Sequence, residues 1–422
     1  MSKPIRKVLK NKLRVLFVPE KDSLTTTVAV LVSAGSDYET KKNNGISHFL
    51  EHMCFKGTEK RPRPIDIATE LDAMGAQYNA FTGNEYTSYY AKVKNNAFGK
   101  AFDVISDIYL NPVFKEEDIN IERGVIIEEI NMYEDTPRSG VQNLFMEAVY
   151  GDQPAGWKIL GTKENILKMG RKDFVEYRSR NYLPESTIVF VSGGANQKDV
   201  MKVIHEKFGG LKNGRKMKKS KVVEVQKKPK ELVFGKKVEQ SHFVLGVRAF
   251  GVHDKRRFAL EVLSNILGGG MSSRLFKRVR DELGAAYYVR SDADLFSDHG
   301  LFAVSAGVQH GKLREVIRVA LEEFENFKRG DVSEKELTKA KEHLIGNLFI
   351  SLETSDSLGY FYGFQEVFGG KLMTPEEVAK KVREVTLADI KKVSRDIFKK
   401  EHLNFALVGP FKTGDFSDIL KM

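Results

Sequence analysis

The chain has a single cysteine, Cys54, among its 422 residues, and it has no long uninterrupted hydrophobic run. One thiol cannot build an internal disulfide framework, which fits a protein of a reducing compartment. The longest apolar runs, such as residues 28–32, are far shorter than the ~20 residues that a membrane-spanning helix needs. Residues 1–20 also lack the apolar core of a signal peptide. We therefore expect a cytoplasmic protein with no membrane partner.

Acidic residues are too few to balance the basic ones, and the net charge is +11. Nine Lys or Arg and one acid, Glu224, lie between Lys212 and Lys230, so this stretch carries +8 and the remainder only +3. The stretch has no aromatic side chains on which bases could stack, and it is typical of a solvated linker. Because most of the excess charge lies in this linker, we expect no nucleic-acid partner.

The sequences on the two sides of this linker resemble each other. A shift of 209 residues pairs Gly75 with Gly284 and Tyr78 with Tyr287. A duplicated unit of roughly 200 residues is the simplest explanation of such an internal echo.

Both halves follow the same order of strand and helix patterns. In the first half, strand patterns lie at residues 14–19, 25–34 and 186–194, a hairpin pattern at 78–93, and helical periods at 45–56, 64–74, 96–110, 115–133 and 163–180. The first two strands are expected to pair with each other. The order predicts an α+β fold with two homologous sandwich domains, each a sheet against helices. We expect these domains at 1–212 and 232–422, joined by the basic linker 213–231.

The stretch HFLEH contains two histidines and a glutamate, His48, Glu51 and His52. On a helix these residues lie within about 100° of one another. Two imidazoles one turn apart can share a zinc ion, and the carboxylate between them faces the same space. This is the H-x-x-E-H pattern of inverzincin peptidases, although an ordinary solvated helix can carry it too. A catalytic zinc also needs a third protein ligand.

The helical pattern at residues 119–133 offers candidates for that ligand. On a helical wheel Glu129 lies about 20° from Glu122, and both fall within an apolar stripe that includes Val125, whereas Glu128 falls on the polar side. A buried carboxylate is costly unless it is paired or bound to a metal. The pattern therefore favours Glu129 or Glu122 over Glu128. The alternative is that both emerge at the edge of the core and pair with lysines.

The run AGSDYETKKNNGISHFLEHMCFKGT closely resembles the pitrilysin and mitochondrial processing peptidase family of zinc peptidases, and the similarity extends over nearly the whole chain. The resemblance implies that His48, His52 and Glu129 bind one Zn²⁺ per chain and that Glu51 is the general base. Glu122 matches the supporting glutamate of the family. Glu122 would orient a ligand histidine.

The second half has its own resemblance to this family. The run GGGMSSRLFKRVRDELGAAYYV resembles the segment in which an arginine and a tyrosine contact the substrate, and the matching residues are Arg280 and Tyr287. Tyr288 competes with Tyr287 for this role. No histidine pair matches in the second half, which implies one metal site per chain. The family also adds the substrate as a strand to a sheet edge, and the matching residues are Asn79, Ala80, Phe81 and Thr82.

The resemblance implies a zinc-dependent metalloendopeptidase that hydrolyses peptides or unfolded segments in an enclosed chamber. Family members form a clam-shell from four units, and this chain supplies two. We therefore expect a homodimer in which the second half of one chain completes the site of its partner, with completion within one chain as the alternative. The rival function is a non-catalytic scaffold subunit of the same fold. The presence of every matching site residue argues for an active enzyme.

Overall fold

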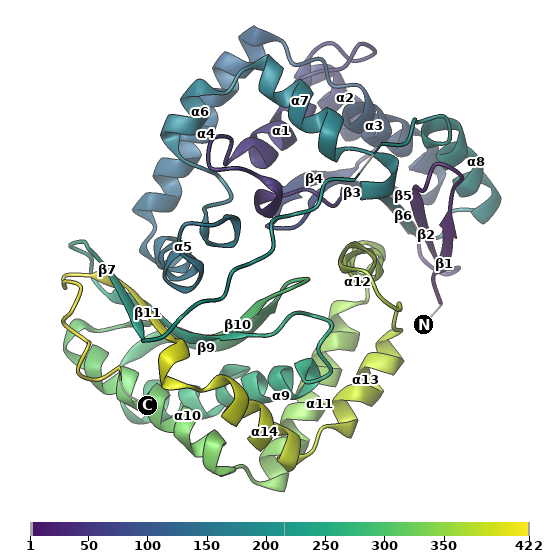
Figure 1. Ribbon diagram of the computed structural model, residues 1–422. Helices are drawn as coiled ribbons and strands as arrows, with labels where there is room; N and C mark the ends of the chain where they lie inside the picture. The colour runs from purple at the N-terminus through teal and green to yellow at the C-terminus, as the bar shows by residue number, and fades with distance from the viewer. Residues whose placement is uncertain (1–2, 215, 421–422) are drawn as a thin grey trace. The chain divides into compact units, whose positions relative to one another are not determined.

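The computed structural model of the protein describes residues 3–214 and 216–420 (Figure 1). One member of the predicted linker, Arg215, lies outside the described residues. The described chain forms two compact units, each with a sheet of its own. The first unit comprises residues up to 130 together with 158–220 and 349–374, and the second comprises 131–157, 221–348 and the residues from 375 onward.

The sheet of the first unit has six strands in the order β1-β2-β6-β3-β5-β4. Its strands are β1 (Ile5–Val8), β2 (Arg14–Pro19), β3 (Thr25–Val32), β4 (Gln77–Thr82), β5 (Thr87–Lys94) and β6 (Thr187–Gly193). The predicted pairing of the first two long strands is wrong, because β6 lies between them, parallel to β2 and antiparallel to β3. Every residue of β6 is buried, and this central position requires two strand partners.

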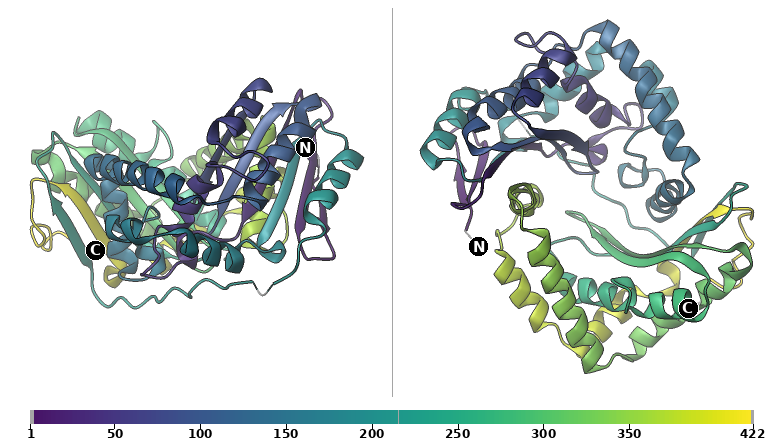
Figure 2. Two further views of the ribbon diagram at one scale, coloured as in Figure 1. Left: turned by 90° about the horizontal axis from the view of Figure 1, so that it is seen from above. Right: turned by 180° about the vertical axis from the view of Figure 1, so that it is seen from behind.

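Both faces of this sheet are covered. Val28 and Val30 of β3 belong to the core beneath the helices of the first half. Thr27, on the opposite face, forms a hydroxyl–hydroxyl hydrogen bond of 2.9 Å with Ser355 of α12 (Ser355–Phe368). Figure 2 shows α12 across the sheet from those helices. Burial on both faces explains why β3 is an unbroken apolar run instead of an alternating pattern.

The helices predicted in the first half are present. They are α1 (Ile46–Cys54), α2 (Pro64–Ala73), α3 (Phe98–Leu110), α4 (Glu116–Asp135), α6 (Lys163–Lys168) and α7 (Arg171–Asn181). A further helix that follows β6, α8 (Gln197–Phe208), was not predicted from the sequence. The expected helical segment at 163–180 is two helices, because the chain is extended at Met169 and Gly170.

The second unit contains a five-stranded sheet in the order β7-β11-β8-β10-β9. The strands are β7 (Lys230–Gly235), β8 (Ser241–Ala249), β9 (Ala286–Leu295), β10 (Gly300–Val308) and β11 (Leu403–Gly409). Its helices are α5 (Pro137–Tyr150), α9 (Arg257–Gly268), α10 (Leu313–Arg329), α11 (Glu334–Ser351), α13 (Pro375–Glu384) and α14 (Leu387–Ile397). The two units therefore share one plan, which confirms the predicted duplicated α+β fold.

Each unit includes one helix from the other half of the sequence. Val141 and Phe145 of α5 pack against Val244 and Ala406 in the second sheet, and α12 packs against the first sheet (Figure 1). Gly359 of α12 permits close approach there, since a Cβ atom at this position would lie 2.4 Å from the ring of Phe190. The compact units each combine several segments of the chain, so they differ from the two duplicated halves of the sequence. The boundaries at 212 and 232 describe those halves and stay a prediction.

The paired glycines of the two halves have matching roles. Gly75 comes shortly before β4 and Gly284 shortly before β9, and their φ angles are 63° and 55°. Glycine is the residue that tolerates positive φ at least cost, so the same turn opens the hairpin in each half. This agreement supports the duplication inferred from the sequence.

The described residues between α8 and β7 contain no helix or strand, as expected of the linker. One of its lysines, however, is not solvated. The side chain of Lys219 is 11% exposed and forms ion pairs with Asp37 and Glu85, both buried in the first unit. Among the described helices none is both long enough and apolar enough to cross a membrane.

Candidate metal centre

Helix α1 presents the H-x-x-E-H residues from the edge of the first core. Phe49, Leu50 and Met53 are fully buried and hold the helix against the sheet and α7. Cys54 is also fully buried, where its thiol donates a hydrogen bond of 3.4 Å to the hydroxyl of Tyr89. The cysteine is therefore part of the core.

Helix α4 supplies the carboxylates. Ile126 and Ile130 are buried, Glu122 is 3% exposed and Glu128 is exposed, which agrees with the predicted orientation of the helix. The prediction for Val125 is wrong, because this side chain is 48% exposed. The buried side of the helix includes Glu122, Ile126 and Ile130, and Val125 lies outside it.

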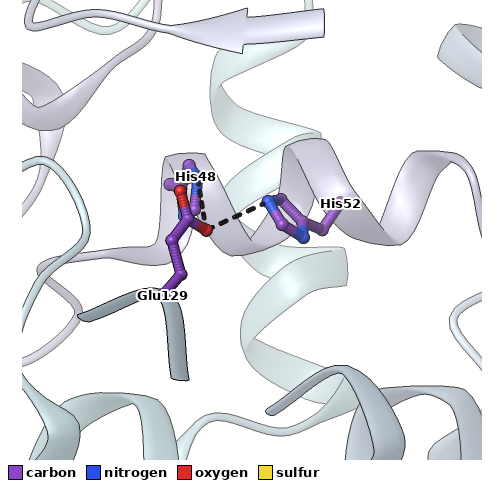
Figure 3. A group of neighbouring side chains, drawn as sticks. All are labelled: His48, His52 and Glu129. Carbon is purple, nitrogen blue, oxygen red and sulfur yellow. Dashed lines mark ion pairs between the residues drawn. The ribbon is translucent and has the colours of Figure 1, made fainter. Parts of the chain in front are cut away.

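The side chains of His48, His52 and Glu129 meet between these two helices (Figure 3). Oε2 of Glu129 lies 3.5 Å from Nε2 of His48 and 3.7 Å from Nε2 of His52. One ligand atom from each residue lies within 4.8 Å of the others. Ligand atoms ~2.1 Å from a tetrahedral zinc ion are roughly 3.4 Å apart, so the spacing and the donor types fit zinc.

A second carboxylate holds one of the imidazoles from behind. Nδ1 of His52 is 2.7 Å from Oε1 of Glu122, and the other carboxylate oxygen of Glu122 pairs with Lys56. Burial would raise the pKa of Glu122, but the hydrogen bonds from His52 and Lys56 outweigh it and lower this pKa. Because Nδ1 faces Glu122, the Nε2 atom of His52 points toward Glu129.

The other imidazole is the more deeply buried. Burial, together with the neighbouring His52, lowers the pKa of His48 to about 3. A neutral imidazole has a lone pair available for a metal. Within the described structure, Nδ1 of His48 is buried and has no hydrogen-bond partner.

Glu51 lies between the two histidines on α1 and is 8% exposed. Burial raises the pKa of Glu51 to about 7, although a hydrogen bond from Thr82 opposes the shift. The hydroxyl of Thr82 donates to Oε2 of Glu51 at 2.5 Å. The sequence places Thr82 in the expected substrate-binding edge strand but does not predict this contact, because the contact joins two elements that are separate in the sequence.

The four residues predicted to bind the substrate as a strand lie on β4, at one edge of the first sheet. Among the described strands β4 pairs only with β5, so its other edge has no strand partner. Phe81 packs against Tyr360 and Phe364 of α12, with ring centroids 5.3 and 6.4 Å apart. Asn79 is exposed and Ala80 is buried.

The predicted arginine and tyrosine of the second half lie within the second unit. Arg280 belongs to a π-helical segment, η5 (Phe276–Glu282), and its guanidinium lies 4.8 Å from the ring centre of Phe276. Tyr287 on β9 is 78% exposed. Tyr288, the competing residue, is half-buried and its hydroxyl lies 3.0 Å from Nδ1 of His242. Exposure therefore favours Tyr287 over Tyr288 as a residue that can contact a ligand.

Comparison with known proteins identifies the family of this chain. Residues 14–163 match the family model described as insulinase (peptidase family M16), and residues 168–344 match the model of the peptidase M16 inactive domain. The chain belongs to peptidase family M16. The family resemblance predicted from the sequence is thereby confirmed, and the H-x-x-E-H motif lies in the region that matches the first model.

Curated relatives of this M16 chain match along nearly its whole length. An uncharacterized zinc protease of Bacillus subtilis, YmxG, is 34% identical, over 96% of this chain and 98% of its own. An uncharacterized zinc protease of Mycobacterium tuberculosis, Rv2782c, is also 34% identical, over 96% of this chain and 93% of its own.

Solved structures share the fold. A protease from Helicobacter pylori is 25% identical with a TM-score of 0.89, covering 97% of this chain and 100% of its own. A peptidase M16 inactive domain from Pseudomonas fluorescens is 16% identical, also with a TM-score of 0.89, covering 97% of this chain and 98% of its own. The two-domain M16 fold is thus common to all three.

Proposed function

We propose that this M16 chain is a zinc-dependent metalloendopeptidase that hydrolyses peptides and unfolded segments. The observation that carries the proposal is the convergence of His48, His52 and Glu129, with the carboxylate of Glu51 on the same helix between the two histidines. The relatives named zinc proteases support the same chemistry.

The three converging residues would hold one Zn²⁺ per chain. A zinc ion bound there supplies Lewis acidity, which makes a water molecule more acidic and polarises the scissile carbonyl. Glu122 keeps the imidazole of His52 in the orientation that directs Nε2 toward the ion, through the hydrogen bond of 2.7 Å.

Glu51 moves the proton in this proposal. Its carboxylate accepts a proton from the attacking water and passes it to the nitrogen of the leaving peptide. The hydroxyl of Thr82 donates to Oε2, which leaves Oε1 to face the water. The peptide adds to the open edge of β4 through backbone hydrogen bonds, so binding depends little on the side chains of the substrate.

Arg280 and Tyr287 are proposed to bind the oxygen of the scissile carbonyl, where negative charge develops. They lie in the half of the sequence that lacks the metal ligands, and we propose that a homodimer brings them to the site of the partner. The cytoplasm remains the proposed compartment, on the grounds of the single buried thiol.

The test combines zinc content with cleavage of an internally quenched peptide. The wild type is expected to bind one zinc per chain and to cleave the peptide. Glu51→Gln should keep the zinc and lower kcat by roughly 10²–10⁴-fold, because the amide cannot accept the proton. Glu128→Gln is the matched control, since this glutamate lies on the same helix as Glu129, is exposed and does not belong to the group of His48, His52 and Glu129.

Two outcomes would contradict the proposal. A wild-type protein with one zinc and no cleavage that depends on Glu51 would favour the scaffold function. A protein that binds no zinc under conditions where the fold is intact would remove the peptidase proposal altogether.

A further inference from the structure

Glu39 is a buried carboxylate that lies between the 3-10 turn η1 (Ser36–Tyr38) and helix α1. The residue is 3% exposed. Its Oε2 atom accepts hydrogen bonds from the backbone N–H of Gly45 at 2.8 Å and from Nδ2 of Asn44 at 2.9 Å. Its Oε1 atom accepts a third hydrogen bond, from the backbone N–H of Ser47 at 2.8 Å.

These donors belong to the start of the helix that carries the metal ligands. The first N–H groups of an α-helix have no partner within the helix, and the helix dipole places partial positive charge on them. Glu39 satisfies the N–H groups of the N-cap residue, Gly45, and of the second helical residue, Ser47. His48 is the next residue along the chain.

The capping side chain comes from a residue six positions before the N-cap, because the N-cap position itself has no room for a side chain. Gly45 has a φ angle of 100°, and a Cβ atom there would lie 2.6 Å from the carbonyl oxygen of Leu160. A serine or aspartate at this position, the common solution, would be strained and would clash. In the described part of the chain, no Lys or Arg is paired with Glu39, so the helix start is its main electrostatic partner.

The second half provides an internal comparison. Helix α9 begins after Arg256, whose backbone N–H donates to Oδ1 of Asp254 at 2.8 Å, and Asp254 also pairs with the guanidinium of Arg256. This contact spans two residues and lies near the surface. Helix α9 carries no metal ligand. Of these two corresponding helices, only the metal-bearing one starts on a buried carboxylate.

We propose that Glu39 is a positioning residue of the metal centre. By holding the first turn of α1, it sets the rotation of the helix and thereby the direction in which His48 and His52 present their imidazoles. The inference rests on the proposed zinc site, and it assigns to Glu39 no contact with metal or substrate.

The test measures the zinc dissociation constant of the purified full-length protein against a competing chelator. Glu39→Gln keeps the size of the side chain, but its amide nitrogen cannot accept, so at least one of the three donors loses its partner. We expect the dissociation constant to rise roughly 10-fold or more. With zinc saturating, kcat for the quenched peptide should fall while KM stays near the wild-type value, because the open edge of β4 is unchanged.

Tyr177→Phe is the control. It removes the hydrogen bond of 2.7 Å between the hydroxyl of Tyr177 and that of Ser47, in the same turn, and leaves the carboxylate cap intact. Its zinc affinity should stay within about threefold of wild type if the cap is what positions the histidines. If Glu39→Gln does not fold, Glu39→Asp takes its place, because it keeps the charge on a shorter side chain. Its zinc affinity should be weaker than that of the wild type.

The outcomes separate this inference from the proposed function. A wild type that binds zinc tightly, with Glu39→Gln and Glu39→Asp folded and equally tight, overturns the positioning role and leaves the peptidase proposal standing. A lower melting temperature with unchanged zinc affinity also overturns it, because Glu39 would then serve the fold alone. A wild type that binds no zinc overturns both.

Discussion

Nδ1 of His52 lies 2.7 Å from Oε1 of Glu122, and Glu122 precedes the proposed third ligand, Glu129, by two turns on the same helix. One helix therefore supplies both a proposed metal ligand and the carboxylate behind another proposed ligand. The two carboxylates can act together because seven residues return a helix to nearly the same face. A shift of α4 would move both groups at once.

Glu122→Gln is expected to weaken zinc binding by roughly 10–100-fold while the protein stays folded. The amide is a poorer acceptor for the Nδ1 proton of His52, and it also loses the ion pair with Lys56. Competition with a chromogenic chelator measures the effect, with Glu128→Gln as the control on the same helix. Equal affinity in the two variants would contradict an orienting role for Glu122.

Local sequence patterns limited the candidate metal ligands to a histidine pair on one helix and two glutamates on another, and the family resemblance selected Glu129 from the two. The spacing of His48, Glu51 and His52 is read along one helix, and the apolar stripe of α4 selects Glu122 and Glu129 over its polar face. Each of these inferences needs only the geometry of a single helix. The structure brings together the three residues that the sequence named as ligands.

Contacts between distant segments were not predictable in the same way. Nothing near β2 or β3 indicates that β6 separates them, and nothing in α12 indicates that it belongs with the first sheet. The hydroxyl of Thr82 and the carboxylate of Glu39 reach α1 across turns whose path the sequence does not specify. Such pairings depend on tertiary packing, which overrides local preference.

The packing of α12 can be tested at its closest contact. Gly359→Ala is expected to destabilise the protein by about 1–3 kcal/mol, because the new methyl group would meet the ring of Phe190 at 2.4 Å. Gly346→Ala on α11 is the matched control, since a Cβ atom there has open space and alanine favours a helix. Denaturant unfolding should therefore shift in opposite directions for the two variants, and a stable Gly359→Ala protein would contradict the tight packing.

Lys219 of the linker makes a buried electrostatic contact, and the loss of this contact should destabilise the protein. Lys219→Met leaves Asp37 and Glu85 buried without this cation, so the free energy of unfolding should fall by about 3 kcal/mol. Lys218→Met removes an exposed lysine next to it and should change stability by less than about 0.5 kcal/mol. Thermal unfolding of the two variants compares them directly. Equal stability would mean that the linker is solvated throughout, as the sequence alone suggests.

The carboxylate of Glu336 should make the stability of the fold depend on pH, through contacts that do not involve the metal centre. Partial burial would raise the pKa of Glu336, but hydrogen bonds from Arg274 and Ser333 outweigh it and lower this pKa to about 2. A lowered pKa contributes stability above the unfolded-state value near 4.5 that is lost as the pH falls toward 2. Because the carboxylate is about one-third exposed, solvent screening reduces the contribution to about 1 kcal/mol. Glu336→Gln should be less stable than wild type at pH 7, and the difference should shrink at pH 3.

Mixed dimers can decide which chain completes each active site. Glu51→Gln and Tyr287→Phe should each be nearly inactive alone. If Tyr287 acts on the metal site of the partner, a mixed dimer has one site with both Glu51 and Tyr287 intact. Random exchange makes half of the dimers mixed, so about one quarter of wild-type activity should return. If each chain completes its own site, every site lacks one residue and mixing restores nothing.

Size-exclusion chromatography of the mixture must show dimers, and a monomer with full activity would contradict the homodimer proposal.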